Sequence, residues 1–134
     1  MDLRERYREW SDKGPVIDGR RITILTGSRS YEVHEEVRIA HVMEALLPGY
    51  EVYVMGPKRV FDEYLDGHHQ GKAQPADQTD PFMPLEYDGR VVDSPATDFS
   101  YDDSIYFFDE PGEYEICWKP GKWQSNTLKI RVFE

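Results

Sequence analysis

The sequence predicts an all-β protein built as an antiparallel β-sandwich, and three observations indicate this class. Short segments rich in β-branched and aromatic residues recur along most of the chain, and polar and apolar residues alternate within them. Gly, Pro, Asn and Asp separate these segments, as turns between strands require. At 134 residues with 39% hydrophobic residues, the chain is long enough for one domain with its own core.

The N-terminal arm, residues 1–20, differs from the rest of the chain. Leu3, Tyr7 and Trp10 recur at helical spacing, which predicts a short helix over Arg4–Trp10. Like-charged residues four positions apart give this helix little local support. We expect its aromatic residues to pack on the main body of the protein or on a second copy of the chain.

The sandwich domain is expected over residues 21–134. Its predicted strands end at Gly, Pro or Asp turns and cover Ile22–Thr26, Tyr31–Glu44, Tyr50–Met55, Val60–Leu65, Ser104–Phe108, Glu113–Lys119 and Thr127–Phe133. Because side chains alternate between the two faces of a strand, the apolar faces predict a shared core. That core should contain Ile39, Tyr114, Ile116, Trp118, Leu128, Ile130 and Val132.

A long insert, at about residues 67–104, interrupts this pattern. It is rich in proline, glycine and aspartate, and only a short strand near Arg90–Val92 is predicted in it. Irregular stretches of this length are uncommon in compact domains and are usually functional or mobile.

The net charge of −10 is concentrated in one region. Between Phe61 and Glu115 only Lys72 and Arg90 oppose fifteen carboxylates. Such a field repels phosphate backbones and anionic lipid, so nucleic acid and membranes are excluded as partners. The charge by itself favours an acidic surface that keeps the protein soluble, and the functional alternative is a protein partner with a basic surface or a hard cation.

Cysteine content and the start of the chain restrict the class further. The single Cys117 excludes an intrachain disulfide framework and a multi-cysteine zinc site. The first residues lack the apolar core of a secretory signal, and no apolar stretch approaches the roughly 20 residues of a membrane span. We therefore expect a cytoplasmic protein.

Two groups of residues are candidates for metal binding. Asp98, Asp102 and Asp103 lie in the acidic insert, and calcium prefers six to eight oxygen ligands of this kind. His68 and His69 follow a turn and form a possible contact for a transition metal or a partner. For both groups, solvated loop residues are the favoured interpretation and metal binding is the alternative. His41 is expected to be a core histidine with a hydrogen-bond partner.

Aromatic residues form the candidate binding surface. Trp123 occupies the last turn, where a tryptophan that faces solvent is typical of interfaces and sugar sites. Tyr87 and Tyr101 join it if the fold brings them together. Packing in the core is the alternative for Trp123.

Three motifs resemble those of bacterial immunoglobulin-like domains: Tyr31-x-Val-x-Glu-x-Val-x-Ile, Phe108-x-x-Pro-Gly-x-Tyr-x-Ile-x-Trp and Ser125-Asn-x-Leu-x-Ile-x-Val. The resemblance extends from Arg21 to the end of the chain apart from the insert. It implies that the first motif leads into the second strand, that the other two form the last hairpin, and that the protein binds rather than catalyses. The chain departs from antibody domains because Cys117 has no second cysteine as a partner.

These observations predict a non-enzymatic binding or accessory module that recognises a protein through the acidic insert and loop aromatics. The alternative is a small enzyme, or a sugar- or calcium-binding module, with a pocket between the insert and the sheet. Exposed edges at Thr127–Phe133 and Ile22–Thr26, together with the arm, also predict a weak homodimer.

Overall fold

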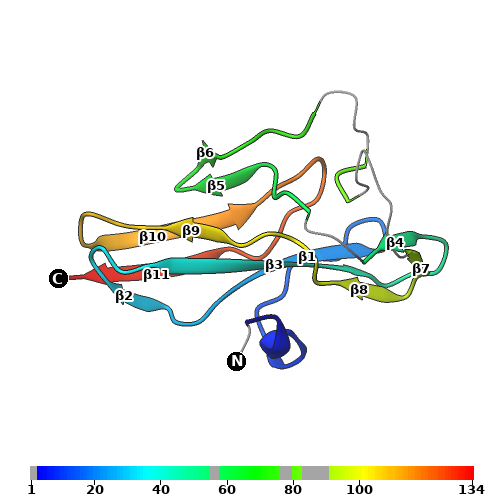
Figure 1. Ribbon diagram of the computed structural model, residues 1–134, viewed down its shortest axis with the longest axis horizontal. Helices are drawn as coiled ribbons and strands as arrows, with labels where there is room; N and C mark the ends of the chain where they lie inside the picture. Colours follow the sequence, from blue (N-terminus) through cyan, green and yellow to red (C-terminus); the bar gives the residue numbers. More distant parts are fainter. Residues whose placement is uncertain (1–2, 55–57, 76–79, 83–90) are drawn as a thin grey trace.

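The computed structural model describes residues 3–54, 58–75, 80–82 and 91–134. One 3₁₀ helix, η1 (Leu3–Glu9), precedes the strands (Figure 1). The strands in this part of the chain are β1 (Arg20–Thr26), β2 (Ser30–Glu32), β3 (Val37–Ala45), β4 (Glu51–Tyr53), β5 (Glu63–Leu65), β6 (His68–Gln70), β7 (Val91–Asp93), β8 (Ala96–Asp98), β9 (Ser104–Tyr106), β10 (Gly112–Trp118) and β11 (Leu128–Phe133). The prediction of a mostly β protein is confirmed.

The strands form two main sheets. In the first, β3 pairs antiparallel with β1 on one side and with β8 and then β9 on the other. The second has the order β2-β11-β10-β5-β6, in which every pair is antiparallel except β2 with β11. A separate two-stranded sheet joins β4 to β7. This arrangement of antiparallel sheets is consistent with the expected sandwich.

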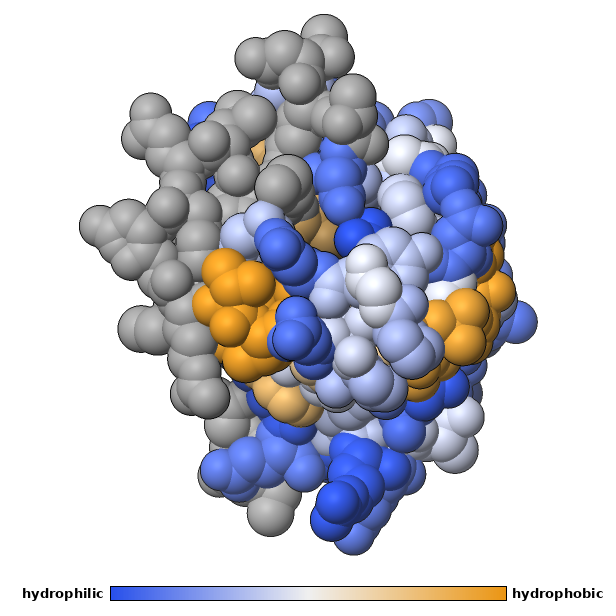
Figure 2. All heavy atoms as spheres, turned by 90° about the vertical axis from the view of Figure 1, so that its right-hand side faces the viewer, coloured by the Kyte–Doolittle hydropathy of each residue, from blue (hydrophilic) through white to orange (hydrophobic). Residues whose placement is uncertain are grey.

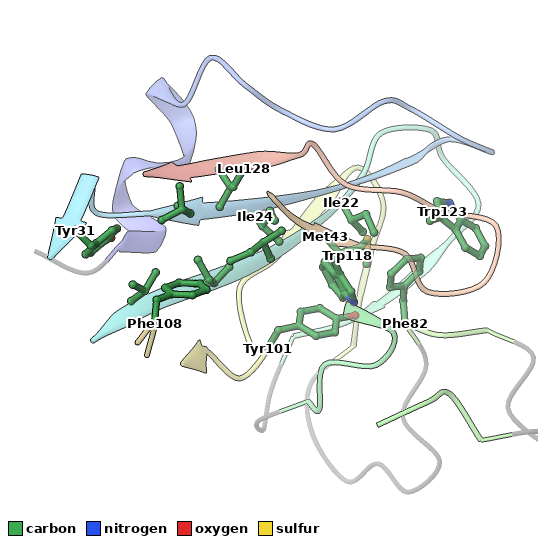
Figure 3. Close-up of a cluster of buried hydrophobic side chains, with 14 of the residues drawn as sticks. Ile22, Ile24, Tyr31, Met43, Phe82, Tyr101, Phe108, Trp118, Trp123 and Leu128 are labelled. Atoms are coloured by element: carbon green, nitrogen blue, oxygen red, sulfur yellow. The ribbon is translucent and has the colours of Figure 1, made fainter. Parts of the chain in front are cut away.

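One hydrophobic core joins the two main sheets (Figure 3). The predicted core residues belong to it: Ile39, Ile116, Trp118, Leu128, Ile130 and Val132 are all buried, and Tyr114 is half-buried against them. The alternation of β11 is regular, with every second side chain buried. Strict alternation therefore identified the inner face correctly.

The N-terminal helix covers the outer face of the first sheet. Tyr7 of η1 packs with Leu25, Ala40 and Val42 in a second, smaller core. Strand β3 is therefore buried on both faces, which explains why its burial does not alternate. Of the two expectations for the arm, the structure shows the one in which it folds onto its own sheet.

Three sequence predictions need correction. The segment Tyr31–Glu44 is two strands in different sheets, β2 and β3, because the chain turns at His34, whose φ is +67°. The described part of the insert contains three strands, β6, β7 and β8, rather than one. The last strand is not an edge, since β11 lies between β2 and β10.

The second predicted edge, β1, is covered by side-chain and loop contacts. The amide of Asn126 accepts a hydrogen bond from the Ile24 N–H at 2.8 Å and donates one to the Ile24 carbonyl at 3.0 Å. Gly14 approaches the same strand so closely that a Cβ there would lie 2.0 Å from the Ile22 carbonyl oxygen. These contacts restrict access to β1 as an edge for another chain.

Candidate functional site

A pocket of about 260 Å³ lies between the edges of the two main sheets. Strands β5 and β6 form one side and β9 forms the other. Its walls combine a carboxylate, two hydroxyls and an amide with apolar surface, supplied by Val60, Glu63, Gln70, Gly71, Ser104, Ile105 and Tyr106. A pocket with a few convergent polar groups is the usual form of a binding site.

Glu63 is the charged group of this pocket. It begins β5, and only 3% of it is exposed. One oxygen accepts a hydrogen bond from His41 Nε2, and the other accepts one from the Tyr106 hydroxyl at 2.5 Å. Burial opposes the charged form of Glu63, but the charge and hydrogen bond of His41 and the hydroxyls of Tyr106 and Ser104 outweigh it and lower its pKa. Glu63 is therefore held as a carboxylate.

His41 supports this carboxylate from inside the core. Strand β3 places it on the inner face, where it is fully buried and meets the Trp118 ring edge-on at 5.0 Å between centroids. Because an ionised Glu63 can only accept, His41 Nε2 carries the hydrogen, and Nδ1 has no partner among the described residues. The expectation of a core histidine with a hydrogen-bond partner is confirmed. His41 does not line the pocket.

Tyr106 links the pocket to strand β9. Burial, the charge of Glu63 and the hydrogen bond to it all raise the pKa of the Tyr106 hydroxyl, so it stays protonated and donates. The arrangement can hold and neutralise a group that enters beside Glu63. It lacks the histidine between nucleophile and carboxylate that serine-type catalysis needs, because here the carboxylate contacts the hydroxyls directly.

Strand β9 is exposed beside this pocket. It pairs with β3 on one side, and none of the described strands pairs with its other side. Ile105 in the strand and Phe107 just after it are 45% and 60% exposed. An unpaired edge that carries exposed apolar side chains is a template for another chain.

The end of the molecule near β4 and β7 also carries exposed apolar side chains, with Leu47 57% and Val91 44% exposed. Hydrophilic residues cover most of the described part of that face, and its apolar patches are separate (Figure 2). At β9, by contrast, the exposed apolar side chains accompany an edge that none of the described strands pairs with, which makes β9 the stronger candidate for a contact surface.

The predicted calcium residues have other partners in the structure. Asp98 is fully buried and accepts a hydrogen bond from the Lys58 ammonium, as well as from the amide and hydroxyl of Ser100. Burial lowers the pKa of Lys58, although Asp98 opposes this shift. Asp98 thus forms a buried ion pair.

The two remaining aspartates lie near the N-terminal arm and β3. Asp103 forms ion pairs with Arg4 and with Arg38, and the exposed Asp102 donates its amide to the Lys58 carbonyl. Within the described ranges, no group of three or more His, Cys, Asp or Glu side chains is placed to hold a metal ion. Calcium binding stays a prediction, which thermal unfolding with and without calcium tests.

Trp123 is buried rather than exposed, which corrects the expectation of a tryptophan that faces solvent. Its ring packs against Phe82 at 5.0 Å between centroids, and its indole N–H donates to the Ile17 carbonyl at 2.8 Å (Figure 3). The Arg20 guanidinium lies over both rings and forms a bidentate salt bridge with Asp80. Its two terminal nitrogens donate to the two carboxylate oxygens at 3.1 and 3.0 Å. The last turn and the insert are therefore joined in the core.

The other candidate binding residues are dispersed. Tyr101 is buried against Trp118, with its hydroxyl unpartnered among the described residues, whereas His68 and His69 are exposed on β6. His69 lies 2.9 Å from a carboxylate oxygen of Asp62. Tyr87 lies outside the described residues. The structure does not bring Trp123, Tyr101 and the two histidines into one surface.

The alternative interpretation expected a pocket between the insert and the sheet, but the residues that line this pocket were not among the predicted site residues. Glu63 stands in an alternating strand within an acidic region, where a carboxylate is usually a solvated residue. A usable signal was present in Ser104–Phe108, because four of its five side chains are apolar or aromatic on both faces of a short strand.

Comparisons with known proteins do not assign the chain to a family: no protein-family model, curated protein or solved structure matches it. Among the described residues, no helix has both the length and the apolar character to cross a membrane.

Proposed function

We propose that this chain is a non-enzymatic binding module that accepts an extended segment of a protein partner as an added strand along β9. The observation that carries the proposal is the one-sided pairing of β9 together with the exposure of Ile105 and Phe107. An added strand would satisfy backbone groups at the edge and cover these side chains, which is the energetic basis of β-strand addition.

The order of the strands supports a binding role through its likeness to immunoglobulin-like topology. We infer that β1, β3 and β8–β9 correspond to strands A, B and E, and that β2-β11-β10-β5-β6 corresponds to A′-G-F-C-C′. In this assignment the described residues supply no strand D beside E. The open side of β9 is the position that strand D would occupy.

The charge of the chain favours a basic partner. Strand β9 lies within the region from Phe61 to Glu115, where fifteen carboxylates oppose two basic residues. A partner segment that alternates apolar and basic residues would meet both the exposed side chains and this field. A second copy of the chain, with the same net charge of −10, is the less favoured occupant and is an outcome of the test.

The alternative is a small enzyme, or a sugar- or calcium-binding module, and the observation in its favour is the pocket at Glu63. The burial of His41 behind Glu63 weighs against catalysis, because the base that contacts the pocket hydroxyls is then Glu63, whose lowered pKa makes it a weak base. Thermal unfolding with and without millimolar calcium tests the cation form of the alternative. A higher melting temperature with calcium would favour it.

A displayed library of random peptides tests the strand-addition proposal. We expect enriched peptides to alternate apolar and basic residues, with their apolar side chains packed on Phe107. Their affinity should fall about tenfold or more for Phe107→Asp, because the apolar contact is lost and a carboxylate would be buried against apolar side chains. Phe133→Asp is the matched control, since Phe133 is 44% exposed at the end of β11. This control should bind the peptides as the unchanged protein does.

Three outcomes decide the proposal. Equal losses of affinity in the two variants, or no enrichment of any peptide, would overturn it. Sedimentation of the protein alone tests whether a second copy of the chain occupies the edge of β9. A dimer that forms with the unchanged protein but not with Phe107→Asp would show that the occupant is a second chain rather than a peptide of another protein.

A further inference from the structure

We propose that the pocket beside β9 binds a Lys or Arg side chain of the added strand, with the cationic head at Glu63 and the carbon chain along the pocket wall. This inference rests on the proposed strand addition, because β9 forms both the open edge and one wall of the pocket. A strand that pairs with this edge would run across the pocket, and alternate side chains would point toward it.

The geometry favours one long side chain. The pocket volume of about 260 Å³ is below the roughly 300–1,000 Å³ of pockets that hold drug-sized ligands. The walls of the pocket come from the edges of the two main sheets. Val60 and Ile105 give apolar surface for a carbon chain, while the polar groups gather around Glu63. Lys and Arg side chains combine these two requirements.

The polar groups of the pocket can accept further hydrogen bonds. A carboxylate offers about four lone-pair sites, and His41, Tyr106 and Ser104 each use one on Glu63, so about one remains. The Gln70 amide nitrogen donates to the His68 carbonyl at 3.0 Å, which leaves the Gln70 carbonyl oxygen as an acceptor. Since Lys and Arg only donate, a set of acceptors around a carboxylate matches them.

The charge near the pocket also favours a cationic side chain as the occupant. Glu63 is the only charged side chain among the described pocket residues. Lys72 follows Gly71 in the sequence but does not line the pocket. A cation that enters would meet the Glu63 carboxylate, which His41 partly compensates from behind, in a partly dehydrated site where charge pairing is stronger than in water.

Small probes test the pocket without a peptide. n-Butylammonium and n-butylguanidinium carry the cationic heads, and 1-butanol is the neutral control of similar shape. In ¹H–¹⁵N spectra we expect the cations at millimolar concentrations to shift the amides of Gly71, Ser104, Ile105 and Tyr106. Butanol should shift them much less. No cation-induced shift at these amides, or equal shifts with butanol, would overturn the inference.

Two variants of β6 sharpen the test. Gln70→Lys places an ammonium of the protein's own at the pocket and should weaken the binding of n-butylammonium about tenfold or more. His69→Lys adds the same charge on the other face of β6, where the ring packs against Tyr64 at 5.3 Å between centroids. This control should bind the probe as the unchanged protein does. Equal weakening in both variants would show a general charge effect and would contradict the assignment of the pocket.

Failure of the inference and failure of strand addition give different results. If peptides lose affinity for Phe107→Asp but the probes do not bind, strand addition holds and the pocket assignment is wrong. If the probes bind but peptides have the same affinity for Phe107→Asp as for the unchanged protein, the pocket accepts cations and the proposed strand addition along β9 is wrong.

Discussion

The Tyr106 hydroxyl donates a hydrogen bond to Glu63, so β9 at the edge of one sheet is tied to β5 of the other. Glu63 in turn is bonded to His41 on β3, two residues beyond the segment that pairs with β9. A buried carboxylate therefore holds together the two sheet edges that border the pocket. This bridge fixes the inner face of β9 while Ile105 and Phe107 remain exposed.

Tyr106→Phe removes one donor from a buried carboxylate while the ring is kept. We expect the free energy of unfolding to fall by about 1–3 kcal/mol, because a largely buried carboxylate loses one of its hydrogen-bond donors. Urea unfolding measures the loss. Tyr114→Phe is the control, since that hydroxyl donates to the exposed Glu110 carbonyl. Losses of the same size in both variants would contradict the bridge.

Glu63→Gln tests the charge of the pocket through the pH dependence of stability. The pKa of Glu63 is lowered in the folded protein, so its ionisation stabilises the fold at pH above its unfolded pKa of about 4.3. This contribution is lost as the pH falls through the lower, folded pKa. The difference in unfolding free energy between the two proteins should therefore shrink as the pH falls from 7 to below 4.

The control for this titration is Glu113→Gln, which removes one carboxylate charge from an exposed position of β10. Its pH profile gives the effect of the changed net charge alone, and that profile is subtracted. A difference between Glu63→Gln and the unchanged protein that does not vary with pH would show that Glu63 contributes no ionisation energy to the fold.

Lys58→Met leaves Asp98 buried without its cation. We expect a loss of about 3–5 kcal/mol in urea unfolding, because an unpaired buried charge is costly. Lys122→Met is the matched control, as Lys122 pairs with Asp18 at an exposed position and should change stability by about 0–1 kcal/mol. Replacing Lys58 and Asp98 together, by Met and Leu, should recover much of the loss. A double variant no more stable than Lys58→Met would argue against the pair.

Gly14→Ala tests the close approach of the Gly14 backbone to strand β1. The added methyl group would lie 2.0 Å from the Ile22 carbonyl oxygen, so the loop or the strand must move. We expect a loss of about 1–3 kcal/mol. Gly27→Ala is the control, because its nearest neighbour would be the Leu3 side chain at 3.7 Å, an ordinary contact. Thermal unfolding of both variants gives the comparison, and a neutral Gly14→Ala would contradict the close approach.

The parts of the fold that follow from local pattern were predicted well. Alternation within β10 and β11 placed Ile116, Trp118 and Ile130 in the core, because a strand of period two signals its buried face directly. The same rule failed at β3, whose outer face is covered by η1. Burial on both faces removes the alternation on which the prediction depends.

The candidate site depends on contacts between distant residues, which local pattern does not encode. Tyr106 and Glu63 are 43 residues apart, and Trp123 is held by Arg20 and Phe82 from earlier segments. A turn position alone suggested that Trp123 faces solvent. Strand β2 pairs parallel with β11, which makes β11 an interior strand. These two strands lie near opposite ends of the sandwich domain in the sequence, so local pattern could not predict their pairing either.

Amide hydrogen exchange of the protein with a selected peptide tests strand addition at β9 most directly. Backbone amides that join a new ladder exchange more slowly, so the account predicts that bound peptide slows exchange in residues 104–108. It predicts little change in β4 and β7, which lie at another end of the molecule (Figure 1). Unchanged exchange in residues 104–108, with slowing confined to other strands, would contradict the account.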